Sequence, residues 1–252
     1  MAMQKKYCIV TGAGSGIGKS TAELFLEKGF TCICIDQDEA NLNALLPGHP
    51  EKYHLVYDLL DDNSYGQIAC ELQSILVNAG FITLINNLGG SKPNSSPLNV
   101  ADWDRFLSSM IFNVKPTACM TDVVVSHMQK IKCGNILNIS SISGRVPHMT
   151  IKEDYAAAKA AILGFSRVKA MELSKDGILV NTLCPGIIAT ERIINRWESR
   201  EQKYNEEILK TIPLGRLGQP EEVAKAAYFL GSDDNSYITG AVLDINGGIF
   251  ML

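Results

Sequence analysis

A serine, a tyrosine and a lysine in the middle of the chain have the types and spacing that suit proton transfer. Tyr155 and Lys159 are four residues apart, so on a helix they share one face, one turn apart. A free phenol has a pKa of ~10, and a neighbouring ammonium lowers it by favouring the phenolate. A hydroxyl at Ser141, with Ser140 and Ser143 as alternatives, is placed to hold a substrate oxygen. The set can move a proton on and off an alcohol or carbonyl oxygen.

A glycine-rich segment near the N-terminus is typical of phosphate binding. Residues 11–18 read T-G-A-G-S-G-I-G, which is the spacing T-G-x-x-x-G-x-G and not G-x-G-x-x-G. Glycines permit positive φ and lack Cβ atoms, so backbone amides at a helix start can approach a pyrophosphate. Between a strand and a helix this pattern favours a dinucleotide site over a plain turn. The residues expected at the cofactor are Gly12, Ser15, Gly16, Ile17 and Gly18.

Asp36 is expected to determine whether the protein binds NAD(H) or NADP(H). It follows Gly18 by eighteen residues, where a carboxylate can accept both ribose hydroxyls of an adenosine and repels a 2′-phosphate. Neither Ser15 nor Gln37 offers a cation to that phosphate, so the sequence predicts NAD(H). Asp58 is expected to contact the adenine. The alternative for both acids is helix capping.

Short apolar runs alternate with helical patterns along the chain, and they predict the elements that position these residues. The predicted strands cover residues 7–11, 31–36, 52–57, 81–86, 134–140, 178–184 and 241–245. The predicted helices cover residues 16–28, 38–45, 61–77, 102–112, 116–130, 152–175 and 219–231. The strands are apolar on both faces, as parallel strands between helices should be. We expect an α/β fold, a single-domain doubly wound (Rossmann) sheet of seven parallel strands over residues 1–252, with helices on both faces. A substrate lid with one helix is expected at 187–213.

The composition argues against several other classes of protein. The chain has 252 residues, with 46% apolar and 20% charged residues and a net charge of −4, which does not favour a nucleic-acid partner. No apolar run reaches the length of a membrane span, and the first residues lack a signal peptide's apolar region. Seven cysteines without a Cys-x-x-Cys pair indicate reduced thiols in a cytoplasmic protein. Four scattered histidines give a metal site little support.

Several motifs in order make the chain resemble the short-chain dehydrogenase/reductase family along essentially its whole length. The matching segments are T-G-A-G-S-G-I-G at 11–18, N-N-L-G at 86–89, Asn113, the Ser141/Tyr155/Lys159 set and P-G-I-I-A-T at 185–190. The resemblance implies the strand order 3-2-1-4-5-6-7 and a homotetramer, with a homodimer as the alternative.

The resemblance also implies roles for individual residues. Tyr155 would be the acid-base residue, and Lys159 would lower its pKa and hold the nicotinamide ribose. Ser141, favoured over its two neighbours, would bind the substrate oxygen. Asn113 would hold a water that links Lys159 to solvent. Further residues expected along the cofactor are Asn87, Gly89, Pro185, Ile188 and Thr190.

The substrate side departs from the family pattern. Ser141 and Tyr155 are fourteen residues apart where the family usually has thirteen, so one residue must bulge within 147–154. Arg192, Arg196 and Arg200 recur in the lid; an ion-paired solvated face is favoured over an anion-binding gate. The pairing acids would be Glu191, Glu198 and Glu201, and further substrate-side candidates are Lys92, Asn94, His148 and Met149.

Together these features predict an NAD(H)-dependent oxidoreductase that interconverts a secondary alcohol and a ketone of a small molecule. One alternative is a 3-oxoacyl-thioester reductase or 3-hydroxyacyl dehydrogenase. Another is a protein that binds NAD as a sensor without turnover. The four residues Asn113, Ser141, Tyr155 and Lys159 favour an enzyme, because a sensor needs no such set.

Overall fold

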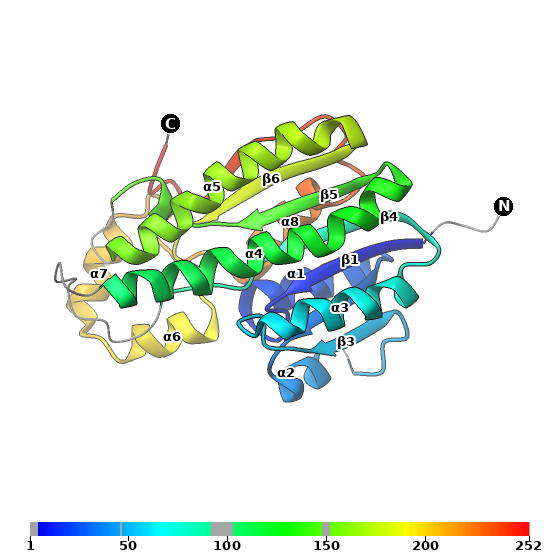
Figure 1. Cartoon of the computed structure of the whole chain (residues 1–252). Helices are drawn as coiled ribbons and strands as arrows, with labels where there is room; N and C mark the ends of the chain where they lie inside the picture. The colour runs from blue at the N-terminus through cyan, green and yellow to red at the C-terminus, as the bar shows by residue number, and fades with distance from the viewer. Residues whose placement is uncertain (1–4, 46, 92–102, 148–151, 252) are drawn as a thin grey trace.

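Parallel strands form one sheet in the order β3-β2-β1-β4-β5-β6-β7 (Figure 1). The protein is described by a computed structural model that covers residues 5–45, 47–91, 103–147 and 152–251. The strands are β1 (Lys5–Thr11), β2 (Thr31–Asp36), β3 (Lys52–Val56), β4 (Ala79–Asn86), β5 (Gly134–Ile139), β6 (Ile178–Pro185) and β7 (Val242–Ile245). Every neighbouring pair is parallel. The predicted fold class and strand order are confirmed.

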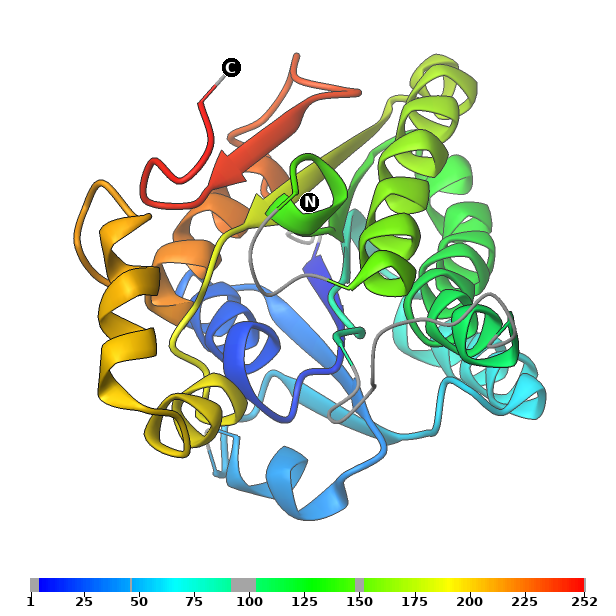
Figure 2. The same cartoon turned by 90° about the vertical axis from the view of Figure 1, so that its left-hand side faces the viewer.

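Helices cover both faces of this sheet (Figure 2). They are α1 (Gly16–Glu27), α2 (Glu39–Ala44), α3 (Asp62–Ile75), α4 (Trp103–Ile131), α5 (Glu153–Leu173), α6 (Glu191–Glu198), α7 (Gln202–Lys210) and α8 (Pro220–Gly231). Buried residues of α3, α4 and α5 join one hydrophobic cluster, and those of α1, α2 and α8 join another. The sheet therefore separates two cores.

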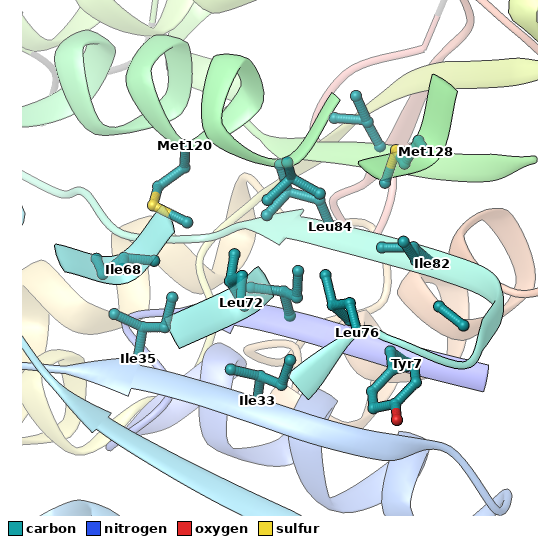
Figure 3. Close-up of a cluster of buried hydrophobic side chains, with 14 of the residues drawn as sticks. Tyr7, Ile33, Ile35, Ile68, Leu72, Leu76, Ile82, Leu84, Met120 and Met128 are labelled. Atoms are coloured by element: carbon teal, nitrogen blue, oxygen red, sulfur yellow. The ribbon is translucent and has the colours of Figure 1, made fainter. Parts of the chain in front are cut away.

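Successive residues of the central strands point into opposite cores, as strand geometry requires. Ile9 of β1 and Ile33 of β2 are paired in the sheet and lie in the cluster under α3 and α4. Figure 3 shows Ile33 in this cluster together with Leu72 and Leu84. Cys8 and Cys32, the preceding pair, lie in the cluster under α1 and α8. Because helices bury both faces, the strands are apolar throughout, which is the pattern that the sequence shows.

Two helix predictions are wrong. Residues 102–112 and 116–130 were expected to form separate helices, but α4 runs through Pro116 without a break. A proline inside a helix removes the hydrogen bond of one amide, and here Met120 and Val124 beyond it are fully buried against the sheet. Their burial outweighs the lost bond. The segment 187–213 contains two helices, α6 and α7, where one was expected.

The carboxyl ends of the strands meet at one edge of the sheet, because all strands run in the same direction. Segments that carry the predicted site residues follow four strands there. They are the glycine loop (the glycine-rich segment at residues 11–18) after β1, residues 87–91 after β4, the 3-10 turn Ile142–Gly144 after β5, and α6 with α7 after β6. Figure 1 shows α6 and α7 beyond the tips of β5 and β6. This edge carries the residues singled out in the sequence.

Candidate active site

Tyr155 and Lys159 lie one turn apart on α5. The Lys159 Nζ atom is 5.8 Å from the centre of the Tyr155 ring and donates a hydrogen bond of 2.9 Å to the Ile139 carbonyl of β5. Ser141 begins the 3-10 turn after β5, and its hydroxyl accepts the Ser143 amide at 3.1 Å. The Ser141 side chain is also close enough to the Tyr155 phenol to lower the pKa of that phenol. The expected serine, tyrosine and lysine are therefore in one place.

The two serines that were alternatives to Ser141 have other partners. The Ser140 Oγ donates to the Lys159 carbonyl at 2.8 Å inside the protein. The Ser143 Oγ accepts from the Ser141 Oγ at 3.1 Å. Ser140 therefore ties α5 to the end of β5 and sets the position of Lys159 relative to Ser141. Sequence reasoning did not predict this positioning contact.

Lys159 is not among the groups that shift the pKa of Tyr155 in this structure, so its expected effect on that pKa stays a prediction. Burial raises the pKa of Tyr155 above its ordinary value, and the hydrogen bond from Ser141 and the charge of Arg192 oppose this. Burial also lowers the pKa of Lys159 to about 8, because the side chain is only 3% exposed. An ammonium in an apolar site is disfavoured before it can favour a phenolate. The amine thus titrates before the phenol in this structure.

Asn113 of α4 clamps the backbone that follows β4. Its Oδ1 accepts the Gly90 amide at 2.8 Å, and its Nδ2 donates to the carbonyls of Ser109 at 3.0 Å and Gly90 at 3.3 Å. A Cβ atom on Gly89 would lie 2.7 Å from Asn113 Oδ1 and 3.1 Å from Lys159 Nζ. Gly89, Asn113 and Lys159 are therefore in direct contact. The water expected between Asn113 and Lys159 stays a prediction.

The glycine loop packs between the end of β4 and the start of α6. Gly12 and Gly16 have φ values of +64° and +52°, which favour glycine. A Cβ on Gly18 would lie 2.5 Å from Asn87 Nδ2, and one on Gly16 would lie 2.9 Å from Thr190 Cγ2. Side chains at these positions would thus collide with both flanking segments. The loop leaves the first amides of α1 for a ligand, as a diphosphate requires.

Two further residues of the loop, Ser15 and Ile17, differ in their exposure. Ser15 is the exposed N-cap residue of α1, in an extended conformation and without a side-chain bond to the helix. Ile17 is partly buried and packs on the core beneath α1 and α8. Ser15 therefore faces outward from the helix start, whereas Ile17 anchors it.

The carboxylate of Asp36 joins β2 to the glycine loop. Its Oδ2 accepts the Gly14 amide at 2.9 Å, and its Oδ1 accepts the Asp38 amide at 3.1 Å. Asp38, not Asp36, is the N-cap residue of α2. Asp58 accepts the Leu60 amide at 2.8 Å and so closes a local turn. Its contact with an adenine stays a prediction.

The segment after β6 brings three of the expected cofactor residues to the same edge. Pro185 ends β6 and pairs with Ile245 of β7. Ile188 bridges to Gly218, and its side chain is buried in the core beneath α1 and α8. Only its main chain is therefore left for a ligand. Thr190 is the N-cap residue of α6 and touches the glycine loop.

The lid arginines do not form the ion pairs that the sequence favoured. Among the described residues, no carboxylate lies within salt-bridge distance of Arg192, Arg196 or Arg200. Arg196 donates to the hydroxyl and carbonyl of Ser91 at 3.3 and 3.4 Å. The other substrate-side candidates, Lys92, Asn94, His148 and Met149, and most of the expected bulge at 147–154, lie outside the described residues.

The sequence did not predict the buried polar residues beneath the site. Thr11 Oγ1 accepts the amides of Asn87 at 3.0 Å and Leu88 at 3.1 Å, which fixes the end of β4 to the end of β1. Asn86 and Asn138, paired between β4 and β5, share a hydrogen bond of 2.8 Å. The available signal was a polar residue at the end of an apolar strand, since burial is costly there without a partner.

Known proteins are similar to this chain in sequence and in fold. The family model described as enoyl-(acyl carrier protein) reductase matches residues 12–249. This chain belongs to the short-chain dehydrogenase/reductase family. A 3-oxoacyl-[acyl-carrier-protein] reductase of Thermotoga maritima is 37% identical and is covered over 99% of both proteins. A (2S)-[(R)-hydroxy(phenyl)methyl]succinyl-CoA dehydrogenase subunit of Thauera aromatica is 32% identical over 98% of both.

Two solved structures with this fold are named with a bound nicotinamide dinucleotide. ElxO with NADP bound superposes with a TM-score of 0.86 at 30% identity, over 98% of this chain and 99% of that one. A 3-oxoacyl-[acyl-carrier protein] reductase of Brucella melitensis with bound NAD gives 0.83 at 27% identity, over 100% and 93%. As a short-chain dehydrogenase/reductase, the protein is an oxidoreductase that uses a nicotinamide dinucleotide.

The described residues offer neither a membrane-spanning helix nor a cluster of metal-binding side chains. None of their helices has the length and apolar character needed to span a membrane. They also hold no group of three or more histidine, cysteine or acidic side chains placed to bind a metal ion.

Proposed function

We propose that this short-chain dehydrogenase/reductase interconverts a secondary alcohol and a ketone with NAD(H), and that Tyr155 is its acid-base residue. The observation that carries the proposal is the shared position of Ser141, Tyr155 and Lys159 at the sheet edge that also holds the glycine loop. A bound nicotinamide would supply the hydride acceptor or donor.

The protein's own part in the reaction is to hold the substrate oxygen and move its proton. The Ser141 hydroxyl acts on the pKa of Tyr155 and so lies near the phenol. An alcohol oxygen between the two would meet one hydrogen-bond donor and one proton acceptor. In oxidation the Tyr155 oxygen takes the hydroxyl proton; in reduction it returns one. Lys159, with its pKa of about 8, carries an ammonium at neutral pH, and we expect this charge to favour the Tyr155 phenolate once cofactor and substrate are bound. A second positive charge beside Tyr155 would favour the phenolate form of Tyr155 further.

The cofactor would lie across the carboxyl edge of the sheet. The diphosphate would meet the amides at the start of α1, and the adenosine ribose would meet Asp36. We assign contacts to the same set as in the sequence: Gly12, Ser15, Gly16, Ile17, Gly18, Asp36, Asp58, Asn87, Gly89, Pro185, Ile188 and Thr190, with Tyr155 and Lys159 at the nicotinamide ribose.

NAD(H) is proposed over NADP(H) on the charge of Asp36. A carboxylate near a 2′-phosphate would disfavour it by a few kcal/mol at short range, or on the order of 100-fold in affinity. Among the solved relatives, ElxO and YwfH are named with NADP(H) and one 3-oxoacyl reductase is named with NAD, so the names do not support NAD(H) and the proposal depends on the charge of Asp36. Asp36→Asn keeps an acceptor for the Gly14 amide but removes the charge. The ratio of NADH affinity to NADPH affinity, measured by calorimetry, should therefore be smaller in this variant than in the wild type. A wild-type preference for NADPH would refute the charge argument.

Turnover by Tyr155→Phe is the direct test of the acid-base assignment. The wild type should change nicotinamide absorbance with a member of a panel of sugars, polyols, sterols and acyl thioesters. Tyr155→Phe should lower kcat by about 10²- to 10⁴-fold and keep its affinity for NAD. Tyr237→Phe, at a tyrosine that is 96% exposed, is the control. Normal turnover by Tyr155→Phe would show that the assignment is wrong. NAD binding without turnover on any substrate would favour a sensor.

A 3-oxoacyl-thioester reductase is the second candidate. It is supported by the name of the 37% identical Thermotoga relative. The two candidates differ in the substrate that the enzyme prefers. An acetoacetyl thioester should have a higher kcat/KM than a neutral ketone of similar size if the second candidate is correct.

The remaining features of the proposal concern the assembly. We assign the whole chain to one domain with residues 187–213 as a lid, and we expect a homotetramer or homodimer in the cytoplasm. Exposed Val168 and Met171 on α5 support an interface, at 50% and 77% exposure, and the seven cysteines are all free thiols. Light scattering of the wild type and of Met171→Glu would test the assembly.

A further inference from the structure

Arg192 of α6 reaches across to the loop that Asn113 clamps. A Cβ atom on Gly90 would lie 2.8 Å from Arg192 Nη2 and 2.9 Å from its Cζ, so the guanidinium packs on the bare backbone of Gly90. Gly90 is bonded to Asn113, and Gly89 before it contacts Lys159. Arg192 is therefore separated from the catalytic lysine by two glycines without side chains.

The charge of Arg192 acts at the reacting groups. It opposes the rise in the pKa of Tyr155 and contributes to the low pKa of Lys159. Of the basic residues that the structure describes, Arg192 is the one that affects both. A guanidinium has five N–H donors in a planar fork that matches a carboxylate or phosphate. In the described part of the chain, Arg192 has no carboxylate partner within salt-bridge distance.

Arg196, one turn further along α6, is a second guanidinium that faces the loop after β4. It is partly buried, and its bonds to Ser91 are long, at 3.3 and 3.4 Å. Burial and the like charges of Arg192 and Arg200 lower its pKa. Arg200 differs, because it lies over the ring of Tyr204 at 5.4 Å within the lid itself. Two of the three arginines thus turn toward the loop after β4, and the third does not.

We propose that Arg192, supported by Arg196, binds an anionic group of the substrate, so that the enzyme prefers carbonyl or alcohol compounds that carry a carboxylate or phosphate near the reacting carbon. The cofactor diphosphate is the other possible anion. Its place is already provided by the glycine loop and the start of α1, whereas Arg192 contacts Gly90 at the catalytic end. The inference rests on the proposed function, because it names the substrate class of that site.

Three oxo acids and their neutral esters test the inference. Pyruvate, acetoacetate and levulinate place a carboxylate at increasing distance from a ketone, and each methyl ester removes the charge. Affinities are measured by calorimetry with the NAD-loaded enzyme, in which a ketone cannot be reduced, so that binding is read without turnover. At least one acid should bind about 10- to 100-fold more tightly than its ester, as expected for a charge-assisted bidentate pair.

The variants are Arg192→Gln, Arg192→Lys and the control Arg200→Gln. Arg192→Gln should remove the preference for the acid and leave NAD affinity within about two-fold. Arg192→Lys should restore part of the preference, since it restores the charge without the fork. Arg200→Gln should behave as wild type. The inference is overturned if no acid exceeds its ester in the wild type, or if Arg192→Gln weakens NAD binding and affects acids and esters equally.

Measurements of turnover distinguish a failure of the anion-site inference from a failure of the proposed function. Kinetics with NADH and the same six compounds give kcat/KM for the wild type and for Tyr155→Phe. Binding of an acid that depends on Arg192, with no reduction of any compound, would support the anion site and count against the proposed reaction. Reduction of the esters as readily as the acids would support the reaction and refute the anion site.

Discussion

Lys159→Met should make the folded protein more stable at neutral pH, although it should stop the reaction. The pKa of Lys159 falls from 10.5 to about 8 in the folded chain. Each pKa unit corresponds to about 1.4 kcal/mol, so the charged amine disfavours the folded state by about 3 kcal/mol below pH 8. Methionine has a similar shape and no charge. It forfeits the bond to the Ile139 carbonyl, worth about 1 kcal/mol, which leaves a net gain of about 2 kcal/mol.

The pH dependence gives this prediction its sign. Between pH 8 and 10.5 the unfolded chain holds a proton on Lys159 that the folded chain has lost. Stability attributable to this group therefore rises with pH across that window. The penalty is complete below pH 8 and disappears as pH approaches 10.5. Lys159→Met should be the more stable protein at pH 7, and its advantage should vanish or reverse toward pH 10.

Urea unfolding at fixed protein concentration measures the difference, because assembly would otherwise alter apparent stability. The control is Lys130→Met, at an exposed lysine of α4, which should change stability little at any of these pH values. A Lys159→Met protein that is less stable at pH 7, by an amount that does not change with pH, would refute the reasoning. The lysine would then be held by interactions that outweigh its burial.

Two further pairs of variants separate shape from chemistry. Gly18→Ala should abolish NAD binding measured by calorimetry, because its Cβ would lie 2.5 Å from Asn87 Nδ2. Gly66→Ala, in α3 with open space around it, should keep NAD binding and stabilise the helix by up to about 1 kcal/mol; equal NAD affinity of the two would contradict the proposed cradle. Ser140→Ala should lower the unfolding free energy by about 1 kcal/mol and lower kcat by less than Ser141→Ala does, because it removes a contact that positions Lys159 and not a group that meets the substrate. Ser141→Ala should change the unfolding free energy little and lower kcat about 10²- to 10³-fold. A larger loss of kcat in Ser140→Ala than in Ser141→Ala would mean that the roles of the two serines are assigned wrongly.

Hydrophobic periodicity predicted most of the fold, because the elements here follow their local patterns. The second strand was predicted at its observed bounds, Thr31–Asp36, and the others differ by up to two residues at each end. The exception, α4, shows the limit of local reasoning. Pro116 predicts a break, and only burial of the residues beyond it keeps the helix whole.

At the candidate site, residue types were easier to predict than environments. The spacing of Tyr155 and Lys159 placed both on one helix face, as the structure has them. It said nothing of how deeply Lys159 is buried, and burial determines the direction of both pKa shifts. The repeat of Arg192 and Arg196 likewise showed a stripe but not what it faces. A sequence gives spacing along one element, whereas charge depends on the elements packed across from it.

The charges around Tyr155 are unbalanced in a way that suits the proposed anionic substrate. Lys159 and Arg192 both bring positive charge to the site, and the Cys184 thiol, whose pKa burial raises to about 11, stays neutral at pH 7. Each cation disfavours the other, and Arg192 contributes to the low pKa of Lys159. An anion bound at Arg192 would cancel that repulsion and raise the pKa of Lys159. The ammonium that favours the Tyr155 phenolate would then be retained to higher pH, so binding of the substrate would extend the pH range over which the acid-base pair is ready to act.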